Sequence, residues 1–167
     1  MIVFSGMKLE KLDDLRKIIA RGQTKVVICA GLLAIALKKA DAELAGSTFE
    51  MGISDDPKHK LFIGPEWVEK CKVMLKKGRE LGVEFVLPVD FLLGDSSVSA
   101  VIPAEGAQFD VGPQTIALHE VKCSEFIEYS RQQIAAGQGP AVAFHNGVFG
   151  KFEEPQFAEG TRQFIEQ

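Results

Sequence analysis

Cysteine is scarce in this chain of 167 residues, which holds only three of them. Cys29, Cys71 and Cys123 are odd in number and far apart, so we expect neither a disulfide framework nor a zinc site built on a Cys-x-x-Cys pair. A reducing compartment fits this usage best. The three histidines are equally scattered, and because ligand spacing is missing we expect no metal site made by the protein.

Long apolar runs and charge clusters are also missing. The longest apolar run, residues 26–37, is too short to span a bilayer, and the N-terminus lacks the charged start of a signal peptide. The 19 Lys and Arg are interspersed with 23 Asp and Glu for a net charge of −4, which argues against a nucleic-acid footprint. We therefore expect a soluble protein that inserts into no membrane and binds no nucleic acid, in the cytoplasm or, as the alternative, in an organelle.

What the sequence does contain is an ordinary globular composition, with 46% hydrophobic and 25% charged residues, arranged as strands that alternate with helices. Strand patterns occur at residues 1–4, 25–29, 84–89 and 141–144, and helical patterns at residues 9–20, 32–39, 65–81, 116–136 and from about 155 onward. Residues 96–107 favour a short hairpin or excursion. The alternation implies right-handed βαβ units, and so a three-layer α/β/α fold whose mostly parallel, Rossmann-like sheet has about four to six strands.

The most informative stretch is residues 146–161, which read NGVFGKFEEPQFAEGT. It follows an apolar run at residues 140–145 that is typical of a short buried strand. The stretch offers an Asn-Gly turn, a carboxylate and a new helix directly after that strand. Open α/β folds bind ligands at the carboxyl edge of the sheet, so this location indicates a candidate site.

Three further segments occur in the order expected of one known family: Ser5-Gly-Met-Lys8, Leu87-Pro-Val-Asp90 and Asp110-Val-Gly-Pro-Gln-Thr-Ile116. With residues 146–161 they make the chain resemble the nucleotide-binding, carboxyl-terminal domain of phosphoglycerate kinase. The resemblance implies that residues 1–167 form a single domain of this kind, incomplete at its C-terminal end. The family's phosphate-binding Gly-Gly-Gly-Asp-Thr loop, with its magnesium-binding aspartate, and the 3-phosphoglycerate domain have no counterpart here.

The resemblance implies nucleotide-binding roles for four residues, Lys8, Gly31, Asn146 and Glu153. Lys8 would reach the phosphates, Asn146 the phosphate and ribose region, and Glu153 the ribose hydroxyls. Gly31 is what is left of the family's triple-glycine turn. Simpler interpretations stay open: a solvated lysine at Lys8, a turn at Asn146, and an exposed acid at a helix start for Glu153.

Several positions depart from the family. Its second phosphate lysine falls on Leu12, and the neighbouring Lys11 would point about 100° away around the helix. Cys29 and Ala30 replace glycines that let the backbone approach adenine. Gln108 replaces another glycine, and Val148-Phe149 replaces a Pro-Met pair. We expect Gln108, Phe149 and the Cys29-Ala30 side chains to close the nucleotide groove, with weak ADP or ATP binding as the alternative.

The two remaining motifs are predicted to be architectural. Gly112-Pro113 and Thr115 suit a turn and helix cap, and Asp90 suits a turn that ends a strand. His145 is not expected to act as a catalytic acid or base, because no partner can be argued from spacing.

Three functions stay open. The first is a phosphoglycerate-kinase-like domain that is catalytically inactive on its own and serves as a structural or protein-binding module in a larger assembly. The alternative is the ADP- or ATP-binding domain of a split or truncated kinase that transfers phosphate between 1,3-bisphosphoglycerate and ADP. An unrelated α/β enzyme is least favoured, since no nucleophile and base pair is visible. We expect no catalytic residue, a protein partner or homo-oligomer, and as cofactor at most weakly bound Mg-ADP or Mg-ATP.

Overall fold

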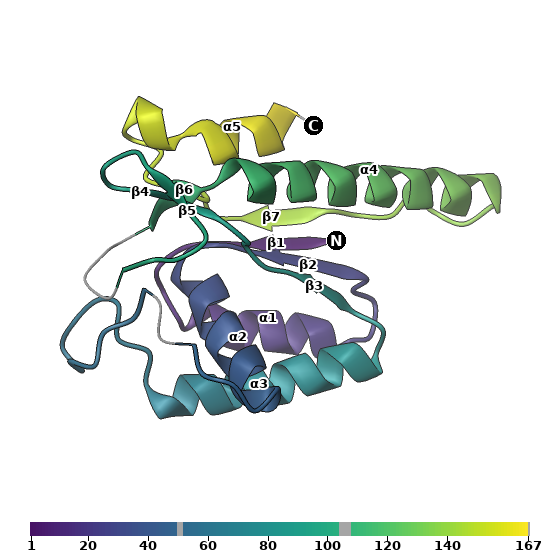
Figure 1. Ribbon diagram of the computed structural model, residues 1–167. Coiled ribbons are helices and arrows are strands. Elements are labelled where there is room, and N and C mark those ends of the chain that lie inside the picture. The colour runs from purple at the N-terminus through teal and green to yellow at the C-terminus, as the bar shows by residue number, and fades with distance from the viewer. Residues whose placement is uncertain (50–51, 104–107, 167) are drawn as a thin grey trace.

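A parallel sheet of four strands forms the centre of the computed structural model, which describes residues 1–49, 52–103 and 108–166. The strand order is β3-β2-β1-β7 (Figure 1). These strands are β1 (Ile2–Phe4), β2 (Val26–Cys29), β3 (Glu84–Val86) and β7 (Phe144–Asn146). All three pairings are parallel, as the alternation of strands and helices predicts.

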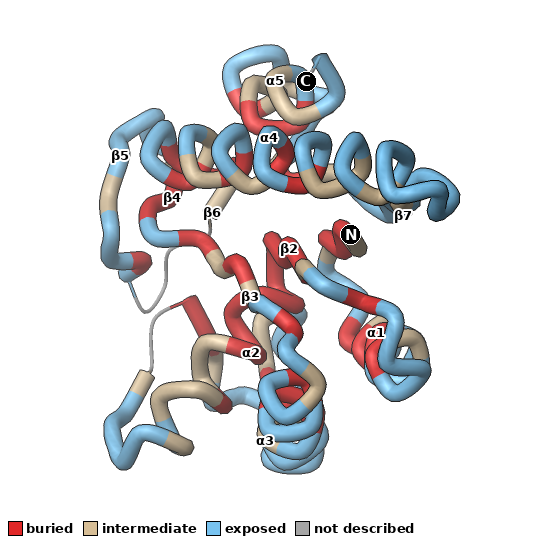
Figure 2. Tube along the Cα trace, turned by 90° about the vertical axis from the view of Figure 1, so that its right-hand side faces the viewer, coloured by how far each residue is buried: buried red, intermediate tan, exposed pale blue. Residues whose placement is uncertain are grey.

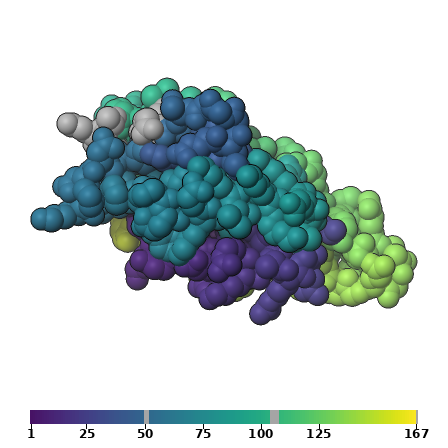
Figure 3. All heavy atoms as spheres, turned by 90° about the horizontal axis from the view of Figure 1, so that it is seen from below, coloured from purple at the N-terminus to yellow at the C-terminus, as the bar shows by residue number. Residues whose placement is uncertain are grey.

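Helices cover both faces of this sheet, which confirms the three-layer α/β/α class (Figure 1). On one face lie α1 (Lys11–Ala20), α2 (Gly31–Leu44) and α3 (Pro65–Glu80), and on the other α4 (Pro113–Ala135) and α5 (Glu159–Glu166). Seen from the α1–α3 side in Figure 3, light green atoms at the end of α4 and before β7 project beyond these three helices. No helix in the described part of the chain is both long and apolar enough to cross a bilayer.

A second, antiparallel sheet lies beyond the carboxyl ends of the main strands (Figure 1). Its order is β5-β4-β6, and its strands are β4 (Phe91–Leu93), β5 (Val98–Ser99) and β6 (Gln108–Val111). The expected hairpin at residues 96–107 agrees with β5 pairing antiparallel to β4. Residues 104–107 of that expectation lie outside the described residues.

The core is divided between the two faces because side chains alternate along each strand. Phe4, Val27 and Cys29 pack with α1, α2 and α3 in the larger cluster. Val3 and Ile28 pack in the smaller one, under α4 and α5. Most of α2 is buried, since it lies between the sheet and α3 (Figure 2).

Element ends differ from the predicted ones at a few places. Pro113 stands at the first position of α4, so this helix begins three residues earlier than its apolar spacing indicates. The last strand is residues 144–146 and not 141–144, because Phe144, not Ala141, takes up the backbone pairing with β1. Pro155 begins only a 3-10 turn, η1 (Pro155–Phe157), before α5.

Candidate functional site

A cavity of about 480 Å3 opens at the carboxyl edge of the main sheet. Its walls come from the loops after β1 and β7, the start of α2, strand β6 and parts of residues 52–61 and 102. The lining residues are Gly6, Met7, Gly31, Leu32, Ile35, Gly52, Lys60, Leu61, Ile102, Gln108, Phe109, Val148, Phe149, Gly150 and Lys151. The lining is mainly apolar, with two lysines and one amide. The expected closure of the groove is therefore wrong.

The residues expected to close the groove leave the cavity open. Cys29 and Ala30 are fully buried and do not line the cavity. Phe149 does line it, but its ring packs against His119 and Phe164, with centroid distances of 5.0 and 5.1 Å. Gln108 also stands at the wall, and the cavity stays open beside both residues.

Two glycines allow the loops at this edge to pass close to one another. Gly31 has a φ of 65°, and a Cβ there would lie 2.7 Å from the Gly6 carbonyl oxygen. Gly147 has a φ of 101°, and a Cβ there would collide with the Ser5 carbonyl oxygen. Side chains at these positions would push the ends of β1, β2 and β7 apart, so the glycines serve the packing of the backbone at the site.

Lys11 lies at the same edge, which corrects our prediction from helix geometry. Its Nζ donates a hydrogen bond to the Ser5 carbonyl oxygen at 3.0 Å and would be 3.4 Å from a Cβ built at Gly147. The 100° separation of Lys11 and Leu12 around the helix holds, but it is Leu12 that points into the core, where it is 2% exposed. The ammonium is thus placed between the ends of β1 and β7.

The four sequence-predicted site residues are only partly brought together. Gly31 lines the cavity. Lys8 and Glu153 are exposed and absent from the lining. The Asn146 carbonyl accepts a hydrogen bond from the Ser5 N–H at 3.0 Å, while the residue is otherwise exposed. Nucleotide-binding roles for these residues stay predictions.

Asp90 and Thr115 join two of the motifs in a buried cap. The Asp90 carboxylate accepts the N–H groups of Gln114 and Thr115, at 3.0 and 2.8 Å, and so satisfies the first turn of α4. The Thr115 hydroxyl donates to the same carboxylate at 2.7 Å. A Cβ at Gly112 would collide with Asp90, which explains the glycine. This contact agrees with the predicted architectural role, with Asp90 as the capping group.

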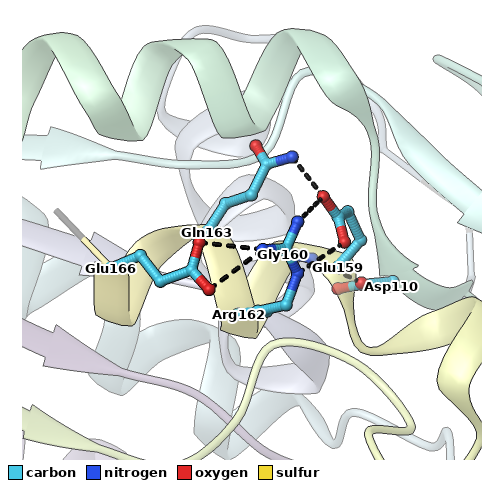
Figure 4. Close-up of polar contacts among 6 residues, drawn as sticks. All are labelled: Asp110, Glu159, Gly160, Arg162, Gln163 and Glu166. Carbon is cyan, nitrogen blue, oxygen red and sulfur yellow. Dashed lines mark hydrogen bonds and ion pairs between the residues drawn. The ribbon is translucent and has the colours of Figure 1, made fainter.

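Asp110 fastens α5 to β6. Its Oδ2 accepts the Gly160 N–H and its Oδ1 the Val111 N–H, both at 2.8 Å. Burial raises the pKa of the Asp110 carboxyl to about 6 against the lowering effect of these hydrogen bonds. Figure 4 shows Glu159 and Arg162 paired on the outer side of the same helix.

Aromatic rings hold α5 against α4 and the segment after β7. His145 lies 5.7 Å from Phe149 and 5.1 Å from Phe164, between ring centroids. His119 is 1% exposed, and its Nε2 has no hydrogen-bond partner among the described residues. Burial lowers the pKa of His119 to about 4, so its ring is neutral at pH 7. This pair of histidines is structural packing behind the cavity wall.

Neither a metal centre nor an activated thiol occurs in the described part of the chain. No group of three or more His, Cys, Asp or Glu side chains there is placed to hold a metal ion. Burial raises the pKa of the thiols of Cys29, Cys71 and Cys123. The groups that the cavity presents are apolar walls, the Gln108 amide and the ammonium groups of Lys60 and Lys151.

Lys11 and the lining lysines, Lys60 and Lys151, were not singled out as ligand contacts in the sequence. The sequence does contain a pattern from which the position of Lys11 could have been predicted. Leucines at positions 9, 12 and 15 form one apolar stripe, which assigns Leu12 to the core and leaves Lys11 beside it on another face. Lys60 and Lys151 carry no comparable signal, because they lie in loops whose course depends on tertiary packing.

Comparison with known proteins gives a consistent result. A family model described as phosphoglycerate kinase matches residues 1–167. The phosphoglycerate kinase of Streptomyces avermitilis is 28% identical over 181 residues, which cover 92% of this chain and 40% of that protein. That of Acidobacterium capsulatum is 32% identical over 139 residues, covering 75% of this chain and 31% of that protein.

Solved structures show the same fold. Phosphoglycerate kinase from Coxiella burnetii superposes with a TM-score of 0.71 at 22% identity, covering 99% of this chain and 38% of that one. The enzyme from Pyrococcus horikoshii gives a TM-score of 0.69 at 18% identity, with the same coverage. The chain therefore spans about two fifths or less of the length of these relatives.

Proposed function

This chain belongs to the phosphoglycerate kinase family, and on that premise we propose that it is a nucleotide-binding domain that takes ADP or ATP in the cavity beside Gly31. We further propose that these 167 residues transfer no phosphoryl group on their own. The observation that carries the proposal is the open cavity at the carboxyl edge of a parallel sheet. Ligands of open α/β folds bind at this edge.

The cavity suits a flat, apolar ring with a polar edge. Its volume of about 480 Å3 falls in the range of ligand pockets, which is roughly 300 to 1,000 Å3. Leu32, Ile35 and Ile102 supply apolar wall, and Gly31 lies between them and the Gly6 backbone. The Gln108 amide both donates and accepts hydrogen bonds, as the edge of a purine base requires.

Cations are available for the anionic end of the ligand. Lys11 uses one of its three donors on the Ser5 carbonyl and has no ion pair recorded among the described residues. Lys60 and Lys151 line the cavity. Lys151 also pairs with Glu154, and its ammonium lies 5.5 Å from the centroid of the Phe109 ring. We assign Lys11 as the main phosphate contact, because its position is fixed by the strand end.

The proposal that the chain transfers no phosphoryl group is supported by the small number of polar and charged side chains that line the cavity. Transfer depends on positioning the reacting groups and on neutralising charge around the moving phosphoryl, usually with a metal ion. Lys8, Asn146 and Glu153 do not line the cavity. Of the carboxylates beside the lining residues, Asp110 next to Gly150 accepts the Gly160 N–H, and Glu154 pairs with Lys151.

Calorimetry with Mg-ADP tests this function. We expect binding in the millimolar range, and Lys11→Ala should weaken it about tenfold or more, since one hydrogen bond to a charged group contributes about 1.5 to 3 kcal/mol. Lys17→Ala is the matched control, because Lys17 lies on the same helix and pairs with the exposed Asp14. Glu153→Ala tests the ribose contact that the resemblance implies, and because Glu153 does not line the cavity, unchanged binding in this variant would remove that contact from the account.

The result that opposes the proposal is equally clear. An absence of heat at millimolar Mg-ADP would refute nucleotide binding. Equal effects of Lys11→Ala and Lys17→Ala would refute the assigned phosphate contact. Turnover of the chain in a coupled phosphoglycerate kinase assay would refute the proposed inactivity.

A role in protein binding is the second candidate, and one observation favours it. Strand β7 is at the edge of the sheet, and it is exposed along its length (Figure 2).

A further inference from the structure

Gln108 and Phe109 are consecutive residues of β6, yet both line the cavity. Side chains of neighbouring residues in a regular strand point to opposite faces of the sheet. In the pairing of β6 with β4, Gln108 and Asp110 are opposite successive residues of β4, so Phe109 between them is the extra residue of a β-bulge. A bulge of this kind turns a side chain toward a neighbouring site. Here it brings an amide and an aromatic ring to the same wall.

The Phe109 ring is held in place by its neighbours. Its centroid lies 5.0 Å from that of Phe157 in η1, and a Cβ built at Gly94 would lie 2.9 Å from the ring. The Phe109 carbonyl also accepts the Lys151 N–H at 2.7 Å, which fastens the bulge to the segment after β7. A flat base that packs against this ring therefore meets a wall that is already fixed.

The Gln108 amide, by contrast, is not fixed in one orientation. The residue is partly exposed, and no hydrogen bond or ion pair of its side chain is recorded in the described part of the chain. The amide presents an acceptor oxygen beside a donor NH2 group. Rotation about the last side-chain torsion exchanges the two groups, and this torsion is broad and roughly two-fold. Both orientations are thus available to a ligand.

We propose that the Gln108 amide contacts the edge of the base and binds 6-amino and 6-oxo purines with similar affinity, so that the cavity takes guanine as well as adenine nucleotides. This inference rests on the proposed function, nucleotide binding in the same cavity. Adenine presents an amino donor next to a ring nitrogen that accepts, and guanine presents an acceptor oxygen next to a ring N–H that donates. One orientation of the amide pairs with the first edge, and the opposite orientation pairs with the second.

Selection between two such ligands requires that the wrong one leaves a polar group of the site unpaired. An amide that can rotate leaves no group unpaired with either base. Gln108 is therefore assigned as the residue that makes the site tolerant, and the same position can be changed to make it selective.

Replacement of Gln108 by glutamate, which has nearly the same shape, should convert this tolerance into a preference for guanine. A carboxylate only accepts hydrogen bonds. It can accept the ring N–H and the amino group of guanine together, but beside adenine one of its oxygens would face a ring nitrogen that also accepts. Gln108→Met removes donor and acceptor alike, so it should weaken the binding of both nucleotides by a similar factor.

Calorimetry with Mg-ADP and Mg-GDP measures the ratio of the two dissociation constants. We expect a ratio within about threefold of one for the wild-type chain and for Gln108→Met. Gln108→Glu should move the ratio about tenfold or more in favour of Mg-GDP, as expected for one hydrogen bond to a charged group. Repulsion between the new carboxylate and the phosphates cancels in the ratio, because both nucleotides carry the same phosphates.

Gln23→Glu is the matched control for the added charge. Gln23 is exposed and precedes β2, so it lies at the opposite end of the parallel strands from the cavity. This variant should keep the wild-type ratio.

A second readout is the side-chain NH2 signal of Gln108 in the nuclear magnetic resonance spectrum of the 15N-labelled chain. Its absence from the spectrum of Gln108→Met identifies it, and it should shift on addition of either nucleotide. A wild-type preference above about threefold for one nucleotide, an unchanged ratio in Gln108→Glu, or a Gln108 signal that moves with neither would overturn this proposal, while binding of Mg-ADP would still support the proposed function. An absence of binding by both nucleotides would overturn the two together.

Discussion

Replacing the buried His119 with phenylalanine should change how the stability of this protein depends on pH. The folded-state pKa of His119 is about 4, against 6.5 for an unburied histidine. As pH falls below 6.5, His119 takes up a proton in the unfolded chain but stays neutral in the folded chain. The free energy of unfolding therefore decreases until pH reaches about 4, where the folded chain binds the proton as well. For these two values the linkage relation gives a loss of about 2 kcal/mol between pH 7.5 and 5.

Asp110 acts in the opposite direction. Its pKa is raised from 3.8 to about 6, so the folded chain binds a proton more readily than the unfolded chain as pH falls through 6. Stability therefore rises toward acid, by about 1.4 kcal/mol between pH 7.5 and 5. The two groups partly cancel in the wild-type protein, and His119→Phe should expose the contribution of Asp110. We expect this variant to lose less stability than the wild type, by about 2 kcal/mol, between pH 7.5 and 5.

Urea unfolding at the two pH values, followed by fluorescence of the single Trp67 in α3, measures this difference. Phenylalanine also removes a buried nitrogen that lacks a partner, so the variant should fold at pH 7.5. His59→Phe is the matched control, since His59 is exposed and should follow the wild type. If His119→Phe and the wild type changed in parallel with pH, the reasoning about burial of His119 would be refuted.

Two further substitutions test the contacts that shape the site. Gly31→Ala should destabilise the fold by about 2 kcal/mol or more in urea unfolding. The added Cβ would lie 2.7 Å from the Gly6 carbonyl oxygen, at a backbone φ of 65°. A loss below about 0.5 kcal/mol would contradict this crowding. Thr115→Val should cost about 1.5 to 3 kcal/mol, because it removes the 2.7 Å hydrogen bond to the buried Asp90 carboxylate. Thr24→Val serves as its comparison, and an equal loss there would contradict a special role for the Asp90 cap.

The layers of the fold could be predicted from the sequence because local patterns determine them. The apolar strand at residues 26–29 and the stripe at Leu12, Leu15 and Ile19 each identify an element and its buried face. From the sequence, Asp90 could be predicted to end a strand in a turn, but not to cap the first turn of α4. Its partner, Thr115, is 25 residues away, and the hydrogen bond between them depends on tertiary packing.

The openness of the candidate site could not be predicted in the same way. Phe149 lines the cavity, and how far its ring fills it depends on packing against His119 and Phe164, which come from α4 and α5. The position of Lys11, by contrast, could be predicted, because the apolar stripe of Leu9, Leu12 and Leu15 shows which face of the helix is buried and leaves Lys11 outside it. The 100° offset between Lys11 and Leu12 was predicted correctly, but the apolar stripe that places Leu12 in the core also leaves Lys11 able to reach the Ser5 carbonyl at the strand end.

A nuclear magnetic resonance titration of the 15N-labelled chain with Mg-ADP tests the central claim, nucleotide binding in the cavity, most directly. The account predicts that the amide signals of Gly31, Leu32 and Gln108 shift together along one saturation curve, and that Lys11→Ala moves this curve to higher concentration. Signals that stay unchanged at millimolar Mg-ADP, or that shift only on the far side of the sheet around α3, would contradict it.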